Sequence, residues 1–189
     1  ESVTGGTGAD TMVVNAAGTT AITVTGGTGN DTITVAAGAT VTMVADAGGT
    51  ADTITLSGAA TIALAAGIET VTGSSGSDSI TGSTGTDLDN IASGDGDDRL
   101  TFGANALQAT DTVNAGNGTD TIVISADGTA VATGVRNAEI LNLATLVDVT
   151  ALDLTGSGIT SVTGAGTTVS NETIVFANVA QTGISIDLG

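Results

Sequence analysis

Apolar and polar residues alternate along most of this chain, in short runs separated by glycine-rich segments. Between positions 31 and 52, residues 32–35 (TITV) and 40–44 (TVTMV) place an apolar side chain at every second position. Residues 36–39 and 46–49 between and after them are small or polar, as in turns. A period of two predicts β-strands, with Val, Ile and Met facing inward and Thr facing outward. About 21 residues therefore make one coil of two strands and two turns.

A nine-residue pattern, G-G-x-G-x-D-x-U-x with U a large apolar residue, recurs in the turns. Residues 5–13 and 26–34 fit it in full, and weaker copies occupy residues 48–54, 73–80, 82–88, 93–100 and 115–122. Asp10, Asp31 and Asp52 follow one another at 21 residues, and Asp98 lies 20 residues after Asp78 and 22 before Asp120. This spacing predicts an all-β fold, a solenoid of stacked coils of about 21 residues with parallel neighbouring strands, in which Asp10, Asp31 and Asp52 stack on one edge.

The glycine–aspartate pattern stops near residue 130, but alternating runs continue, as in residues 137–143 (NAEILNL) and 159–164 (ITSVTG). Residues 67–73 (GIETVTG) are similar to residues 137–143, which suggests a variant of the same coil. We therefore divide the chain into a repeat-bearing solenoid, residues 1–129, and further solenoid coils with few ion-binding turns, residues 130–189. The longest apolar run, residues 59–68, is too short for the roughly 20 residues of a membrane span.

Composition and charge limit the kinds of functional site that the chain can form. Two Lys or Arg residues face 20 Asp and Glu residues, for a net charge of −18, and the chain has no His and no Cys. This excludes His-based triads, Cys nucleophiles and zinc sites with N or S ligands, and it argues against nucleic acid as a partner. Carboxylates stacked about 5 Å apart on neighbouring strands repel unless a cation lies between them. Two Arg cannot supply that charge, but Ca²⁺, which takes six to eight oxygen ligands, can.

The seven copies, spread over residues 5–123, resemble the calcium-binding repeats of the RTX family. Together with the richness in Thr, Ala, Gly and Val and with runs such as residues 137–143, they are similar to the large RTX-type surface-layer (S-layer) proteins of Gram-negative bacteria. The resemblance implies a β-roll or β-helix that is exported by type I secretion and forms a Ca²⁺-dependent lattice on the cell surface. We expect another copy of the chain as the main partner and a cell-surface polysaccharide as a further one.

In the RTX turn, the Asp side chain and the carbonyls of the first and third turn positions bind Ca²⁺. The resemblance therefore implies these ligands, turn by turn: Gly5, Thr7 and Asp10; Gly26, Thr28 and Asp31; Gly49 and Asp52; Gly73, Ser75 and Asp78; Gly82, Thr84 and Asp87; Ser93, Asp95 and Asp98; Ala115, Asn117 and Asp120. Asp10 and Asp31 match the pattern in full. The glycines before Asp52 are displaced by one position, which weakens that match.

Other interpretations of the pattern stay open. The copies could be tight turns in a Thr-rich β-protein, whereas a phosphate-binding loop is disfavoured by Asp95, Asp97 and Asp98 within one copy. Instead of a lattice protein, the chain could be an RTX adhesin or a carbohydrate-binding module of a larger secreted protein. We expect no enzymatic activity, although Arg99, which lies within a repeat, is the one candidate for a catalytic base.

Overall fold

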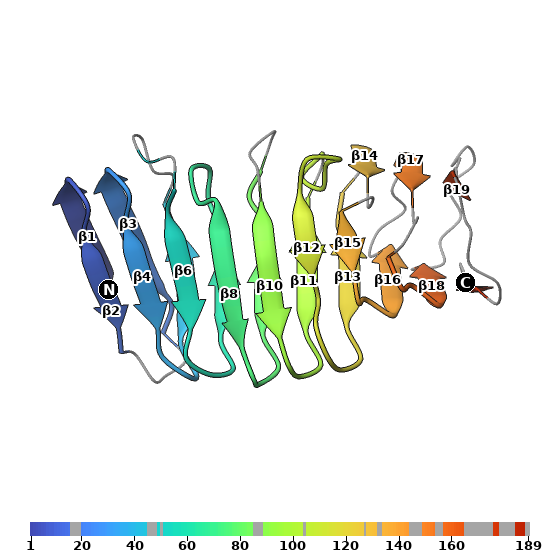
Figure 1. Ribbon diagram of the computed structural model, residues 1–189, viewed down its shortest axis with the longest axis horizontal. Coiled ribbons are helices and arrows are strands. Elements are labelled where there is room, and N and C mark those ends of the chain that lie inside the picture. Colours follow the sequence, from blue (N-terminus) through green and yellow to red (C-terminus); the bar gives the residue numbers. More distant parts are fainter. Residues whose placement is uncertain are drawn as a thin grey trace.

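The structure is a computed structural model that describes residues 1–15, 20–44, 49, 51–84, 89–103, 105–126, 128–131, 134–143, 149–153, 157–164, 176–177 and 184–187. Strands stack side by side into an elongated rod, with the two chain termini at opposite ends (Figure 1). Every described strand pair is parallel, as a solenoid requires, because each coil repeats the path of the coil before it. The prediction of an all-β parallel solenoid with coils of roughly 21 residues is confirmed.

Two sheets form the walls of the rod. The first sheet has ten described strands: β1 (Ser2–Thr7), β3 (Ile22–Thr28), β5 (Thr40–Met43), β7 (Thr61–Ala63), β9 (Ser79–Thr81), β11 (Arg99–Phe102), β13 (Thr121–Ile124), β16 (Ile140–Leu143), β18 (Ser161–Gly164) and β20 (Ser185–Asp187). The second sheet has seven: β2 (Thr11–Val14), β4 (Thr32–Val35), β6 (Thr53–Leu56), β8 (Thr70–Ser74), β10 (Asn90–Gly94), β12 (Thr112–Asn114) and β15 (Val135–Arg136).

A third sheet of three described strands begins where the second sheet ends. It contains β14 (Gly128–Val131), β17 (Val149–Asp153) and β19 (Phe176–Ala177). The first sheet nevertheless runs on through β16, β18 and β20 without a change of partner order. The division of the chain at residue 130 stays a prediction.

The core lies between the first and second sheets, and its side chains stack in register from coil to coil. In the second sheet one interior row is made by Met12, Ile33, Ile54, Val71, Ile91, Val113 and Val135. In the first sheet the matching row is made by Ile22, Val41, Ile62, Ile80, Leu100, Ile122, Leu141 and Val162. All of these residues are buried, which confirms the predicted orientation of the alternating runs.

Two long edges join the sheets, and they carry the polar chemistry. At the first edge the chain passes from a strand of the first sheet to one of the second, as between β3 and β4. At the second edge it passes back, as between β10 and β11. Among the described residues, no helix is long and apolar enough to cross a membrane.

Candidate metal centre

Four of the glycine-rich turns share one backbone conformation. The second and fourth positions of the repeat have positive φ angles between 99° and 145°, in the pairs Gly6 and Gly8, Gly27 and Gly29, Gly94 and Gly96, and Gly116 and Gly118. Glycine is required there for a second reason, since turns of successive coils touch through their backbones. A Cβ atom on Gly27 would collide with the carbonyl oxygen of Gly6 in the coil before it.

At the first edge, carboxylates form a ladder that links one coil to the next. The backbone N–H of Asp10 donates to Oδ1 of Asp31 at 2.8 Å, and the N–H of Asp31 donates to Oδ1 of Asp52 at 2.6 Å. The N–H of Asp52 in turn donates to Oε2 of Glu69 at 2.7 Å. We call these four residues the first ladder. The predicted stacking of Asp10, Asp31 and Asp52 on one edge is confirmed.

A second ladder of the same design runs along the second edge. The N–H of Asp78 donates to Oδ1 of Asp98 at 2.7 Å, and the N–H of Asp98 donates to Oδ1 of Asp120 at 2.8 Å. Oε2 of Glu139 accepts the N–H of Asp120 at 2.8 Å. Asp78, Asp98, Asp120 and Glu139 are the second ladder. Each ladder thus consists of three Asp residues followed by one Glu.

Several ladder carboxylates keep one oxygen that is buried and accepts no hydrogen bond. This holds for Oδ2 of Asp10, Asp31, Asp98 and Asp120 within the described part of the chain. Asp31, Asp98 and Asp120 are each no more than 2% exposed. A buried carboxylate is costly unless a positive charge or further donors satisfy it. The ladders therefore have the electrostatic character of cation sites.

The turns also bring backbone carbonyl oxygens close to these carboxylates, beside glycines that carry no side chain. A Cβ atom on Gly5 would lie 2.8 Å from Oδ2 of Asp10 and against the carbonyl oxygen of Gly26. One on Gly49 would lie 2.7 Å from Oδ1 of Asp52 and 2.5 Å from the carbonyl oxygen of Gly29. Carboxylate and carbonyl oxygens thus converge where side chains are missing, a donor set that suits Ca²⁺. No three acidic side chains converge in the described residues, so an ion here would take one or two carboxylates and complete its shell with carbonyls or water.

Compared with known protein families, the chain matches the RTX calcium-binding nonapeptide repeat (4 copies) over residues 23–39, 65–88 and 107–123. This chain carries RTX calcium-binding repeats. Ca²⁺ is the ligand of such repeats, and it fits the oxygen-rich turns described above. No curated protein and no solved structure matches the chain.

The RTX turns are not all alike, because hydrogen bonds already satisfy some carboxylates. Oδ1 of Asp78 accepts the N–H of Ala60 at 2.8 Å, and its Oδ2 accepts the N–H and the hydroxyl of Ser74 at 2.8 and 3.0 Å. Asp111, at the first edge, accepts the N–H of Asp89 at 3.2 Å and the N–H of Gln108 at 2.7 Å. These two carboxylates have much less need of a cation than Asp31 or Asp120.

The other predicted ligands differ in their contacts and exposure. The carbonyl of Thr28, paired in register with Thr7, accepts the N–H of Gly8 at 2.6 Å. Ser93 is buried and donates its hydroxyl to the carbonyl of Ala115 at 2.6 Å. Asp95 and Asn117 are exposed and bond to each other at 2.7 Å. Gly73 packs against the Ser93 backbone, Ser75 and Thr84 are exposed, and Gly82 lies beside Asp89.

The turn before β10 contains a buried carboxylate that the motif does not identify. Asp87 lies outside the described residues. Asp89, two positions later, is buried directly before β10, the position that ladder residues occupy before their strands. Its Oδ2 accepts the N–H and the hydroxyl of Ser83 at 3.2 and 3.3 Å. Sequence reasoning missed Asp89, Glu69 and Glu139, although each directly precedes an alternating run.

Burial raises the pKa of three carboxyls, two of them in the second ladder. Burial, with smaller contributions from the neighbouring charges of Asp98 and Glu139, raises the pKa of the Asp120 carboxyl to about 6, against the lowering effect of a backbone hydrogen bond. Burial likewise raises the pKa of Asp98 and of Asp111. Without a cation, the folded chain therefore favours the protonated forms of Asp98, Asp111 and Asp120 more than the unfolded chain does.

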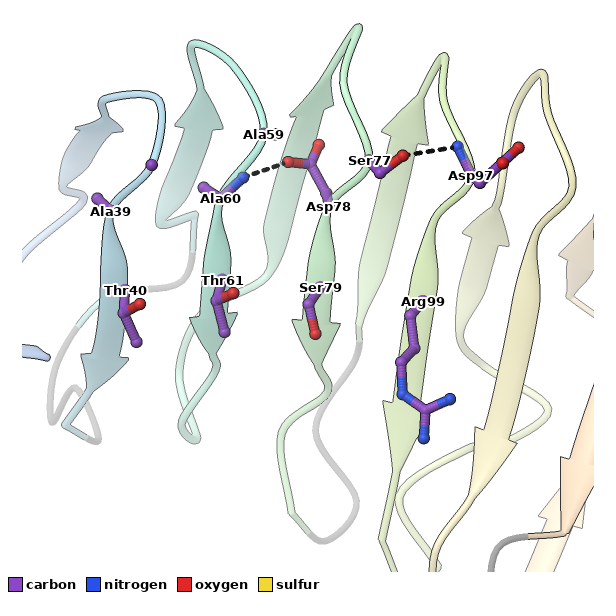
Figure 2. A pocket seen from close by; sticks show the side chains of 11 residues that line it. Ala39, Thr40, Ala59, Ala60, Thr61, Ser77, Asp78, Ser79, Asp97 and Arg99 are labelled. Atoms are coloured by element: carbon purple, nitrogen blue, oxygen red, sulfur yellow. Dashed lines mark hydrogen bonds between the residues drawn. The ribbon is translucent and has the colours of Figure 1, made fainter. Parts of the chain in front are cut away.

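A shallow groove of about 390 Å³ lies beside the second edge (Figure 2). Its floor is made of small residues from three coils, and Asp97 and Arg99 flank it. The N–H of Asp97 donates to the hydroxyl of Ser77 at 3.1 Å. The carboxylate of Asp78 accepts the N–H of Ala60 from the neighbouring coil (Figure 2). Among the described residues that line the groove none is aromatic, so these residues provide no stacking platform of the kind found in a typical sugar site.

Proposed function

We propose that this chain is a segment of a secreted bacterial surface-layer protein that folds and self-assembles when its carboxylate ladders bind Ca²⁺ outside the cell. RTX repeats in a β-solenoid fit a secreted RTX-type protein, and RTX repeat proteins are typically secreted. The ladders support the more specific part of the proposal, which is that Ca²⁺ drives folding and assembly. The single observation that carries the proposal is the row of buried carboxylate oxygens without hydrogen bonds, in a chain of net charge −18.

The ladders couple folding to the ionic environment. Where Ca²⁺ is scarce, Asp98 and Asp120 repel each other across one coil spacing, and their unsatisfied oxygens oppose burial. Ca²⁺ supplies positive charge and oxygen coordination at these turns. At a concentration ten times Kd, each site adds about 1.4 kcal/mol of stability. A handful of such sites matches the roughly 5–15 kcal/mol that separates folded from unfolded domains.

Self-assembly requires a surface on which two copies of this negatively charged chain do not repel each other. We assign this role to the outer face of the second sheet, because its outward-facing side chains form rows across the strands that are uncharged along most of their length. One row consists of Thr11, Thr32, Thr53, Thr70, Asn90 and Thr112 in register. The RTX repeat solenoid is a structural, non-catalytic fold, and we assign this segment no reaction.

The test separates folding from assembly. Ca²⁺ is titrated into the chain while negative-stain electron microscopy and light scattering follow particle size, with Mg²⁺ as the control ion. We expect ordered sheets or arrays at millimolar Ca²⁺, and monomeric rods at saturating Ca²⁺ would overturn the lattice proposal. Thr53→Glu puts a negative charge in the middle of the neutral row and should block assembly with Ca²⁺-dependent folding intact, whereas Thr53→Gln should assemble normally.

A further inference from the structure

We propose that Glu139 is the terminal Ca²⁺ ligand of the second ladder, sharing an ion with Asp120, and that Glu69 holds the equivalent place in the first ladder. This inference rests on Ca²⁺ binding by the ladders in the proposed function, and it names ligands outside the glycine–aspartate motif. Glu139 also lies outside the residue ranges that match the RTX repeat.

The first argument is position. Oε2 of Glu139 accepts the N–H of Asp120 at 2.8 Å, and Oδ1 of Asp120 accepts the N–H of Asp98 at the same distance. In the first ladder, the bond from Asp52 to Glu69 measures 2.7 Å and the bond from Asp31 to Asp52 measures 2.6 Å. The two Glu carboxylates therefore occupy the place that an Asp carboxylate occupies one coil earlier.

The second argument explains why the residue is Glu. Glu69 follows Gly67, with φ of 87°, and Glu139 follows Asn137, with φ of 57°, each after one buried apolar residue. These turns lack the two positive-φ glycines of the repeat, and the intervals to the Glu residues are 17 and 19 residues, against 20 to 22 between Asp residues. A side chain longer by one methylene group brings the carboxylate to the ladder position from a differently placed backbone.

The third argument is an unsatisfied oxygen on Asp120 itself. Asp120 is fully buried, and its Oδ2 accepts no hydrogen bond in the described part of the chain. The next carboxylate along the second edge is that of Glu139, which is held against the Asp120 backbone. Two adjacent carboxylates with an unsatisfied buried oxygen form a site for a cation, whereas a simple structural cap would need only the hydrogen bond.

The test is Glu139→Gln, because Gln keeps the oxygen that accepts the Asp120 N–H but loses the charge. Calorimetric Ca²⁺ titration and thermal melts in Ca²⁺ and in chelator compare it with wild type and with Asp187→Asn, a control at an exposed carboxylate on β20. We expect Glu139→Gln to lose one bound Ca²⁺, or about tenfold or more in the affinity of one site, since affinity follows ligand charge. Its Tm in chelator should rise while its Tm gain from Ca²⁺ shrinks.

Two results would overturn the inference. One is unchanged Ca²⁺ stoichiometry and affinity in Glu139→Gln; the other is a Tm that falls equally with and without Ca²⁺, as expected for a structural cap. Glu69→Gln repeats the test in the first ladder, should Glu139→Gln fold poorly. A wild-type chain that neither binds Ca²⁺ nor gains Tm from it would instead refute the proposed function. The failure of the inference and the failure of the proposed function are therefore distinguishable.

Discussion

Replacing Asp31 by Asn should stabilise the protein in chelator and destabilise it in Ca²⁺. Asp31 sits in the middle of the first ladder, where it accepts the N–H of Asp10 and donates its own N–H to Asp52. The Asn side chain retains an oxygen for the Asp10 N–H, so the change removes chiefly one buried charge. Without Ca²⁺ that removal relieves repulsion within the ladder.

The magnitude in Ca²⁺ follows from the stacking. An Asp in the middle of a ladder lies between two ion sites, one on each side. Each bound ion adds about 1.4 kcal/mol to the free energy of unfolding at a Ca²⁺ concentration ten times Kd. Losing both sites would lower the free energy of unfolding by about 3 kcal/mol relative to wild type at that concentration. Asp31→Ala should lose a further 1–3 kcal/mol or so, because the Asp10 N–H then has no acceptor in its partly buried position.

The assay is urea denaturation followed by circular dichroism, in saturating Ca²⁺ and in chelator, with linear extrapolation to water. Asp187→Asn, at an exposed position, serves as the control and should change neither curve by more than about 0.5 kcal/mol. If Asp31→Asn gained as much stability from Ca²⁺ as wild type does, Asp31 would not be a ligand, and the argument from its unsatisfied oxygen would be wrong.

Three further predictions concern pH, turns and core. Because the pKa of Asp120 is raised from 3.8 to about 6 in the fold, its stabilising contribution is complete below 3.8 and is lost as the pH rises through 6. Thermal melts in chelator should therefore show Tm falling over that range, and a rising Tm would contradict the burial argument. Gly27→Ala should cost about 2 kcal/mol or more with or without Ca²⁺, since φ is 120° and the Cβ meets the carbonyl of Gly6. Gly103→Ala, where a Cβ meets nothing within 4 Å, is the control, and equal losses in urea melts would refute the steric account. Ile54→Ala should cost roughly 2–5 kcal/mol by the same melts in both conditions, because Ile54 is fully buried; a loss seen only in chelator would show that the core depends on the ions.

The sequence predicted the solenoid and the three stacked Asp residues of the first ladder because both follow from periodicity. Alternation at every second residue determines which side chains face the core, and an interval of 21 residues places Asp31 above Asp10 once coils stack. These are local rules repeated along the chain, so a single sequence carries them clearly. Thr32 and Thr53, for instance, lie in register on the outer face.

The sequence could not predict features that depend on contacts between coils. The interval from Asp52 to Asp78 fits no whole coil, and the structure places the second ladder on the opposite edge. Glu69 and Glu139 lack the motif, and only the register of their turns brings them into the ladders. The hydrogen bonds that Ser74 donates to the Asp78 carboxylate could not be predicted from the motif either, because they depend on the shape of one turn.

The most direct test of the central claim is a Ca²⁺ titration of the purified chain followed by far-ultraviolet circular dichroism, then reversed with chelator. If the buried ladders require cations, the metal-free chain at neutral pH should be largely unfolded or far less stable. A cooperative gain of β-signal should then appear as Ca²⁺ approaches millimolar concentration, with little response to Mg²⁺. An identical spectrum and identical thermal stability with and without Ca²⁺ would contradict the account, and the Asp turns would then be ordinary turns.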